Sequence, residues 1–159
     1  MAVQGNKTRN ENMKKIGFVL LTLVALFGIS ATTSSSSNHS ISLDLYNIRN
    51  TKGNMYIYLY NYSNQYPYHP YKHFKISKQN VKDGHLRYTI SSLKKGQYVI
   101  TAIDDENANN NLDRVLGIPK EGYAFSNNVK GFILPAYHRL QFQLSESKKH
   151  LSLKVQYVK

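Results

Sequence analysis

The chain has 159 residues, of which 41% are hydrophobic and 19% are charged, and this size and composition favour one globular domain. It contains no cysteine, which excludes disulfide bonds, thiolate zinc sites, cysteine nucleophiles and a lipid carried on cysteine. The formal net charge is +12 at pH 7, which favours anionic partners in general. Nucleic acid is not expected among them, because the lysines are scattered singly and form no basic block.

The N-terminal part reads as a targeting segment. Met13 and two lysines precede the apolar run IGFVLLTLVALFGIS, which is shorter than the roughly 20 residues that a membrane-spanning helix needs. Small residues at the end of this run suit cleavage before Ala31, and Met13 is an alternative start. We therefore expect a signal peptide at 1–30, a flexible Ser-rich leader at 31–39 and a folded domain at 40–159. An uncleaved membrane anchor is the alternative.

Apolar and polar residues alternate from Ser40 onward, as expected for strands with one buried face. The apolar positions of the five alternating runs are Ile41, Leu43 and Leu45; Met55, Ile57 and Leu59; Leu86, Tyr88 and Ile90; Leu140, Phe142 and Leu144; and Leu151, Leu153, Val155 and Tyr157. The run GQYVITAI (96–103) is apolar on both faces, which predicts a central strand. A turn at 145–149 is expected to join the last two runs. The proline-containing segment 65–73 is expected to cross between sheets.

These patterns predict an all-β fold, a single antiparallel β-sandwich of about seven strands. The phrase L-x-x-G-x-Y (93–98) resembles prealbumin-like sandwiches at the level of the fold. The expected domain is prealbumin-like or immunoglobulin-like, with a long ordered loop after the central strand. Within it, Tyr56, Tyr58 and Tyr60 fall on one face of a strand. An exposed row of tyrosines is a ligand face that stacks on sugar rings or bases. In the alternative, which we favour, both faces of the strand are covered.

The run DDENANNNLD (104–113) is the most distinctive polar segment. Oxygen-bearing side chains occupy every second position, namely Asp105, Asn107, Asn109, Asn111 and Asp113. Calcium takes six to eight oxygen ligands from such loops, so calcium is the one cofactor expected, with an affinity of about 10⁻⁴ to 10⁻³ M. Asn110 stands where the helix-flanked calcium loop has glycine, and asparagine tolerates the left-handed backbone needed there. The alternative is a polar connector whose side chains hydrogen-bond its own backbone.

The loop continues as LGIPKEGYAFSNN, and the two parts together resemble the bacterial domain-of-unknown-function family 2141. The family pattern is D-E-N-x-N-G-x-L-D followed by G-I-P-x-E-G-Y-G-F-S-N-N, and the resemblance spans about residues 41–159. In this signature loop the matching residues include Glu106, Glu121, Gly122, Tyr123, Phe125, Ser126 and Asn127. Asn110 and Ala124 depart from two glycines of the pattern. The resemblance implies an exported β-sandwich domain with no assigned activity.

The signature residues also carry structural expectations. The glycines and proline of GIPKEGY indicate a long loop that folds back on itself. Glu121 either adds a ligand to the ion or accepts backbone hydrogen bonds from the loop, and we favour the second. Phe125 is expected to plug one end of the sandwich, while Ser126 and the two asparagines after it hydrogen-bond a turn.

An enzyme is not expected. The surroundings of Ser126 lack the G-x-S-x-G pattern of a nucleophile elbow, and Glu106 and Glu121 in one loop are a weak pair for hydrolysis. The leading hypothesis is an exported envelope module, periplasmic or extracellular, that binds a glycan, peptide or protein. The alternative is a structural domain held electrostatically on anionic lipid or wall polymer, and a hydrolase using the loop carboxylates is the lesser alternative. Membrane contact is expected only through an uncleaved signal segment or an anionic surface.

Overall fold

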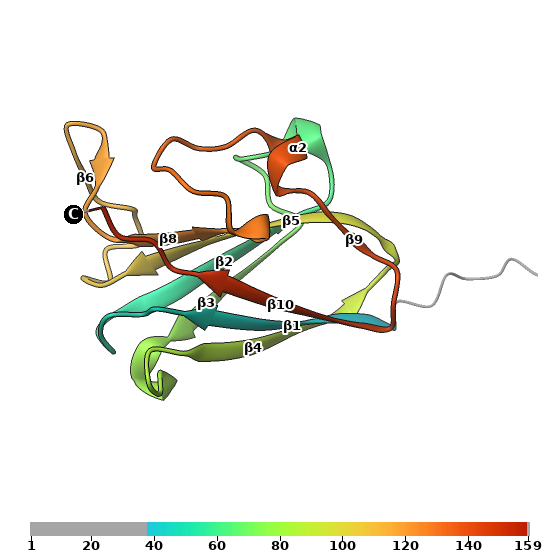
Figure 1. Ribbon diagram of the computed structural model, residues 1–159, viewed down its shortest axis with the longest axis horizontal. Coiled ribbons are helices and arrows are strands. Elements are labelled where there is room, and N and C mark those ends of the chain that lie inside the picture. The colour runs from blue at the N-terminus through green and yellow to red at the C-terminus, as the bar shows by residue number, and fades with distance from the viewer. Residues whose placement is uncertain (1–37, 159) are drawn as a thin grey trace, which may run out of the picture. The chain divides into compact units, whose positions relative to one another are not determined.

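The computed structural model describes residues 38–158 (Figure 1). The predicted signal peptide and nearly all of the predicted leader lie outside the described residues. In chain order the elements are β1 (His39–Tyr46), β2 (Asn54–Tyr60), η2 (Ser63–Gln65), β3 (Lys72–Ser77), η3 (Lys78–Asn80), β4 (Leu86–Leu93), β5 (Gly96–Asp105), β6 (Arg114–Val115), β7 (Ile118–Pro119), β8 (Gly122–Phe125), η4 (Ser126–Asn128), α2 (Tyr137–Leu140), β9 (Phe142–Leu144) and β10 (Lys148–Lys154). None of the helices in this part of the chain is long and apolar enough to cross a membrane.

Two sheets pack face to face in a sandwich-like β domain, as the alternation predicts. The first sheet has the strand order β10-β1-β4, and the second has the order β3-β2-β5-β8. Strand β5 pairs with β2, β8 and β9, which confirms it as the central strand. The short strands β6 and β7 form a separate hairpin at the end of the domain where β5 finishes.

The hydrophobic core lies between the sheets because alternate side chains of each strand point inward. It contains the predicted apolar positions of β1 and β2, Leu86 and Ile90 of β4, and Ile100, Ala102 and Leu153, while Tyr88 is partly buried against it. A second apolar cluster lies on the outer face of the second sheet. Its buried members are Tyr60, Val99, Tyr123, Phe125 and Leu140. The second sheet is therefore covered on both faces, and the loops that cover its outer face shape the candidate site.

One strand pairing differs from the expected antiparallel arrangement. Strand β10 runs parallel to β1, with Ser40 opposite Lys148 and Tyr46 opposite Lys154. The expected turn after β9 does not form a hairpin, because β9 pairs with β5 in the second sheet while β10 belongs to the first. The chain crosses between sheets at 145–147, and β10 then runs in the direction of β1 (Figure 1).

The segment 65–73 was expected to cross between sheets, and this expectation is wrong. It joins β2 to β3, which are antiparallel neighbours in the second sheet. Strand β3 itself was not predicted, although Lys72, Phe74 and Ile76 are less exposed than the residues between them. Because the segment connects adjacent strands, it folds over the outer face of the sheet instead of leaving it.

Candidate functional site

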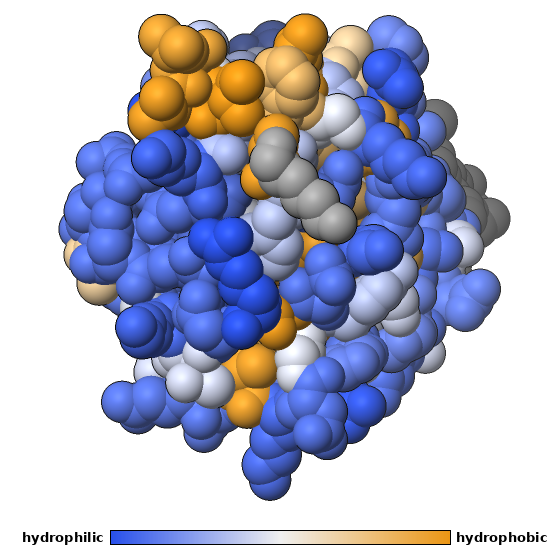
Figure 2. All heavy atoms as spheres, turned by 60° about the vertical axis from the view of Figure 1, so that its left-hand side comes forward, coloured by the Kyte–Doolittle hydropathy of each residue, from blue (hydrophilic) through white to orange (hydrophobic). Residues whose placement is uncertain are grey.

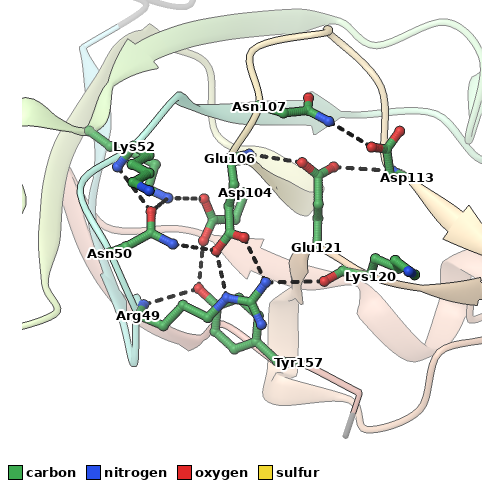
Figure 3. Close-up of polar contacts among 11 residues, drawn as sticks. Arg49, Asn50, Lys52, Asp104, Glu106, Asn107, Asp113, Lys120, Glu121 and Tyr157 are labelled. Atoms are coloured by element: carbon green, nitrogen blue, oxygen red, sulfur yellow. Dashed lines mark hydrogen bonds and ion pairs between the residues drawn. The ribbon is translucent and has the colours of Figure 1, made fainter.

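Glu121 closes the base of the signature loop. Its side chain is only 4% exposed, and its carboxylate accepts hydrogen bonds from two backbone N–H groups. The N–H of Glu106 donates to Oε1 over 2.9 Å, and the N–H of Asp113 donates to Oε2 over 3.1 Å (Figure 3). The expectation that Glu121 accepts backbone hydrogen bonds is confirmed. One carboxylate thereby joins the start and the end of the loop.

Two aspartates organise the interior of the loop. The carboxylate of Asp105 accepts from the backbone N–H groups of Asn109 at 3.1 Å and Asn110 at 2.9 Å. The carboxylate of Asp113 accepts from the side-chain amides of Asn107 at 2.7 Å and Asn109 at 2.9 Å. Asn110 has a φ of 68°, so the left-handed backbone predicted at this position is confirmed. The loop is ordered by its own polar side chains.

The same hydrogen bonds bear on the predicted calcium ligands. The oxygens of Asn107 and Asn109 also accept from backbone N–H groups, those of Asn109 and Asn111. Among the described residues, no three His, Cys, Asp or Glu side chains are grouped so as to hold a metal ion. Four of the five predicted ligands, all except Asn111, therefore already accept hydrogen bonds within the loop through their side-chain oxygens. Calcium binding stays a prediction.

A partly exposed ion pair anchors the loop to the segment before β2. The Arg49 guanidinium donates to both carboxylate oxygens of Glu106 at 2.6 Å, and the Asn50 amide donates to the same carboxylate at 2.7 Å (Figure 3). Hydrogen bonding to Arg49 lowers the pKa of Glu106, and the same bond raises the pKa of Arg49. Glu106 is thus held ionised as part of the framework.

Beneath this pair lies a fully buried charge cluster. Lys78 and Asp104 form an ion pair in which both side chains are completely buried, and the Tyr157 hydroxyl donates to the other Asp104 oxygen. The Lys78 ammonium also donates to the Asn50 side-chain oxygen at 3.1 Å. Burial raises the pKa of Asp104, and the contacts with Lys78 and Tyr157 oppose that shift. The cluster connects β5, η3 and the C-terminal segment.

The segment after the loop folds back as the β6–β7 hairpin, as the glycine and proline pattern predicts. Arg114 pairs with Pro119, and Val115 pairs with Ile118. The two turn residues, Leu116 and Gly117, have φ values of 50° and 80°. The Arg114 guanidinium donates to the Gly117 carbonyl at 3.0 Å, which fastens the turn from the side.

A cavity of about 380 Å³ lies on the outer face of the second sheet, between this hairpin and two other loops. Strands β2, β5 and β8 form its floor, and the loops after β2, around β6–β7 and after η4 form its walls. The lining residues are Tyr58, Tyr60, Pro67, Tyr68, Pro70, Thr101, Ala102, Ile103, Leu112, Arg114, Pro119, Tyr123, Phe125, Phe132 and Leu134. The site thus combines the predicted tyrosine strand with the second half of the signature.

The three tyrosines of the predicted ligand face have different positions. Tyr58 and Tyr60 line the cavity, whereas Tyr56 is buried outside the lining and donates its hydroxyl to the Asn110 side-chain oxygen. The Tyr60 hydroxyl donates to the Pro67 carbonyl at 2.9 Å. Within the described residues the Tyr58 hydroxyl makes no hydrogen bond. Tyr58 is therefore the tyrosine of this strand that is free to contact a ligand.

The cavity lining is mostly apolar, and its polar side-chain groups are the hydroxyls of four tyrosines and Thr101 and the guanidinium of Arg114. Burial raises the pKa of Tyr58, Tyr60 and Tyr123, so their hydroxyls are neutral hydrogen-bond donors at pH 7. Arg114 is the charged member of the lining as described here. An apolar ligand that carries one acidic or hydrogen-bond-accepting group matches this arrangement.

A protein-family model matches most of this folded domain. The model of a family described as "Uncharacterized protein conserved in bacteria (DUF2141)" matches residues 43–152. The chain belongs to the DUF2141 family. No curated protein and no solved structure matches the chain significantly. The match confirms the resemblance seen in the sequence and covers the signature loop, the hairpin and the cavity.

In this DUF2141 domain, the hydrogen bonds expected of Ser126 and Asn127 are present, whereas Phe125 does not plug one end of the sandwich, because it lies on the outer face of the second sheet. Phe125 belongs to the second apolar cluster, and the Ser126 hydroxyl donates to the Leu140 carbonyl while accepting from the Ile100 N–H at 3.1 Å. The Asn127 amide donates to the carbonyls of Arg139 and Gln141, each at 3.1 Å. These contacts hold α2 and the loop before it against the sheet.

Two functional features of the domain were missed in the sequence. Nothing in the segment SKQNVKDG distinguishes Lys78 as a buried charge, because lysine in a turn is normally solvated. The cavity walls come from loops far apart in the chain, but two of them carry a visible signal. The runs VLGI (115–118) and FIL (132–134) are apolar segments outside the long alternating strands.

Proposed function

We propose that this domain is an exported, non-enzymatic binding module of the bacterial envelope that holds an apolar ligand in the cavity beneath its loops. The single observation that carries the proposal is the aromatic and apolar lining of a cavity of about 380 Å³. This volume lies within the roughly 300–1,000 Å³ of typical small-molecule sites. The Tyr58 hydroxyl and the Arg114 guanidinium supply polar groups for an acidic or accepting end of the ligand.

The lining favours an apolar ligand over a glycan. A sugar presents many hydroxyl groups, each of which needs a hydrogen-bond partner when it is buried. The lining offers the hydroxyls of four tyrosines and Thr101 and the Arg114 guanidinium, and the Tyr60 hydroxyl already donates to the Pro67 carbonyl. The loop walls consist mainly of proline, leucine and phenylalanine side chains. An apolar side chain of a peptide or the tail of an amphiphile is buried there without leaving polar groups unpaired.

The cavity is tested with two fluorescent probes of similar size, anionic 1-anilinonaphthalene-8-sulfonate and uncharged N-phenyl-1-naphthylamine. Tyr58→Ala removes part of the floor, and Leu134→Trp fills the mouth from a partly exposed loop position. We expect each variant to lower the affinity for both probes about tenfold, a loss of about 1.4 kcal/mol. Arg114→Gln is expected to lower the affinity for the anionic probe more than the affinity for the uncharged probe.

The matched control is Tyr62→Ala, which removes a tyrosine that is 60% exposed and does not line the cavity. Near-ultraviolet circular dichroism checks that each variant keeps its fold, because these probes also bind partly unfolded chains. Equal binding of both probes by wild type and all folded variants contradicts the proposal. Tyr58→Ala and a further variant, Phe125→Ala, are then mixed with envelope extracts, and each is expected to retain less envelope material than the wild type does.

The absence of enzymatic activity is part of the proposal. The described lining of the cavity has no carboxylate, imidazole or thiol, the groups that most often act as general acids, bases or nucleophiles. Glu106 is paired with Arg49, and Glu121 is buried between two backbone N–H groups. Both observations support structural roles for these carboxylates. Hydrolase activity in a broad substrate screen that disappears in folded Glu106→Gln protein contradicts this part.

Export is supported by the sequence at 1–30, which lies outside the described residues. We expect cleavage before Ala31, so that protein recovered from the bacterial envelope begins at or near this residue. N-terminal sequencing or intact mass of that protein measures the cleavage site. Recovery of the uncleaved chain from membranes indicates the anchor alternative, and recovery from the cytoplasm contradicts export.

A further inference from the structure

The three loops that wall the cavity each carry an apolar or aromatic side chain that is directed into solvent. Tyr68 follows β2 and is 82% exposed, Leu116 in the β6–β7 turn is 97% exposed, and Ile133 after η4 is 76% exposed. Each loop also contributes residues to the lining, so the three exposed side chains surround one cavity. Figure 2, which brings forward the end of the domain that carries β6, shows apolar side chains gathered at the top of the view above a hydrophilic surface.

Leu116 is not explained by the local structure. It occupies the first position of a two-residue hairpin turn, where both residues have positive φ. Asparagine, aspartate or glycine suits this position best, because other side chains strain the left-handed backbone. Leucine here adds strain and, at 97% exposure, gains almost no packing in return. Strain and exposure at the same residue indicate a contact outside the domain.

The charges around these loops have one sign. Arg114, Lys120 and Lys130 are exposed, and they flank the apolar positions of the second and third loops. Between residues 112 and 140 the carboxylates are those of Asp113 and Glu121. Glu121 is buried, and both oxygens of Asp113 accept amide hydrogen bonds. The apolar tips are therefore bordered by cations, with the nearby carboxylates engaged inside the domain.

We propose that this end of the domain docks on an anionic lipid bilayer, with Leu116 and Ile133 entering the headgroup region. Tyr68 then lies at the interface, where tyrosine is favoured, and the cations meet lipid phosphates. The exposed apolar residues of the hairpin and of the loop after η4 are Val115, Leu116, Ile118, Phe132, Ile133 and Leu134. Because cations border them, apolar side chains and positive charge occur together, and this combination matches an anionic bilayer. Docking goes beyond the cavity function, since it needs no cavity ligand, and it brings the cavity mouth to the membrane.

Tryptophan placed at the tips tests the proposal directly, because the chain contains no tryptophan. Leu116→Trp and Ile133→Trp are compared with Thr89→Trp, an exposed position on β4 in the first sheet. The full chain is mixed with vesicles designed to contain phosphatidylcholine and phosphatidylglycerol in a 3:1 ratio. Brominated acyl chains in these lipids quench the fluorescence of a tryptophan that enters the bilayer. We expect strong quenching at both tips and little at position 89. Because all three proteins share the same N-terminal segment, lipid binding by that segment does not produce the difference.

A second arm tests the charges in the Leu116→Trp background. Lys120→Gln and Lys130→Gln are each expected to raise the lipid concentration for half-maximal quenching about fivefold. The matched control is Lys94→Gln with Lys95→Gln, two exposed lysines in the turn before β5. This turn lies at the opposite end of β5, a strand of 10 residues, from the signature loop. The control pair is expected to leave the quenching unchanged.

The proposal is overturned if lipid does not quench the tryptophans at positions 116 and 133. It is also overturned if lipid quenches all three tryptophan positions equally. Self-association in sedimentation velocity that Leu116→Asp abolishes, with no quenching by lipid, assigns the tips to a second copy of the chain and also overturns it. The outcome is separate from that of the cavity proposal. The probes can fail to bind the cavity while lipid still quenches the tryptophans at the loop tips. Lipid quenching can likewise be absent while the probes bind.

Discussion

Lys78 and Asp104 form an ion pair at the end of the sandwich in which neither side chain reaches solvent. Lys78 begins the 3₁₀ turn after β3, and Asp104 lies near the end of the central strand β5. Removing two charges from water is costly, and the pair is tolerated because each group has further hydrogen bonds, from Tyr157 and to Asn50. Together with Tyr157, the pair therefore connects three distant segments of the chain under the signature loop.

Replacing one member of this pair is expected to lower the free energy of unfolding more than replacing both. Lys78→Met leaves the Asp104 carboxylate buried without its cation, so we expect the free energy of unfolding to fall by about 3–5 kcal/mol. Urea denaturation followed by circular dichroism measures the loss. The matched control, Lys78→Met with Asp104→Leu, is expected to recover part of the stability. A loss of less than about 1 kcal/mol in Lys78→Met indicates that the pair contributes little.

The Arg49–Glu106 pair is expected to make stability depend on pH on the acid side. Hydrogen bonding to Arg49 lowers the pKa of Glu106 below its ordinary value of 4.5. The stabilisation is therefore fully present above pH 4.5 and is lost as the pH falls through the lowered pKa of the folded state. Glu106→Gln removes it, and we expect a difference from wild type of about 1 kcal/mol at pH 7.

This difference between wild type and Glu106→Gln is expected to shrink steadily below pH 4.5. The raised pKa of Asp104 has the opposite sign, because it lowers stability as the pH rises through it. Both proteins contain Asp104, so the difference curve isolates mainly Glu106. Glu146→Gln, an exposed glutamate outside the loop, is the control. The titration is designed to run from pH 3 to 7. If the difference in the free energy of unfolding does not change with pH over this range, the role assigned to Arg49 is ruled out.

Two glycines with similar backbone angles are expected to respond differently to alanine. Gly53 has a φ of 71° and Gly117 a φ of 80°, so both substitutions carry the left-handed penalty of about 1–2 kcal/mol. A Cβ at Gly53 lies 1.9 Å from the Asp105 carbonyl oxygen, whereas nothing lies within 4 Å of a Cβ at Gly117. We expect Gly53→Ala to cost about 3 kcal/mol or more in urea denaturation, well above Gly117→Ala. Equal losses contradict the close approach of these backbones.

Calcium is expected to add modest stability to a loop that also forms without it. The carboxylates of Asp105 and Asp113 already accept hydrogen bonds within the loop, so chelation with EGTA is expected to leave a cooperatively folded domain. With a dissociation constant of about 1 mM, adding about 10 mM calcium raises the free energy of unfolding by about 1.4 kcal/mol. Magnesium at the same concentration is the ion control, and Asp113→Asn is the matched variant. An unchanged melting temperature and no calorimetric heat exclude a calcium site.

Alternation in the sequence predicted most of the sheet residues, because burial on one face of a strand leaves a period of two. It identified the inward positions Ile41 to Leu45 and Met55 to Leu59 correctly. It did not reveal β3, where only Phe74 and Ile76 are apolar and prolines precede the strand. The parallel pairing of β1 with β10 also leaves no trace in the pattern. Alternation reports which face is buried and not which neighbour a strand has.

The candidate site was predicted in part. The left-handed Asn110 and the backbone hydrogen bonds to Glu121 followed from residue type and loop pattern, since both respond to local backbone needs. The cavity did not, because its walls meet only when the loops after β2, around β6 and after η4 fold over one sheet face. Leu116 and Ile133 stood in the sequence as apolar residues outside the long strands, and their exposure depends on that folding.

The parallel pairing of β1 with β10 has a consequence for the order in which the domain is assembled. The first strand of the fold lies between β4 and the last strand, so it keeps an unpaired edge until residues 148–154 are available. Tyr157, which reaches Asp104, arrives later still. When the chain becomes available from its N-terminal end first, the first sheet and the buried charge cluster therefore form only after the last residues are available. Pairing between strands that are far apart in the sequence is typical of β proteins that fold slowly. The domain therefore stays incompletely folded until β10 is available.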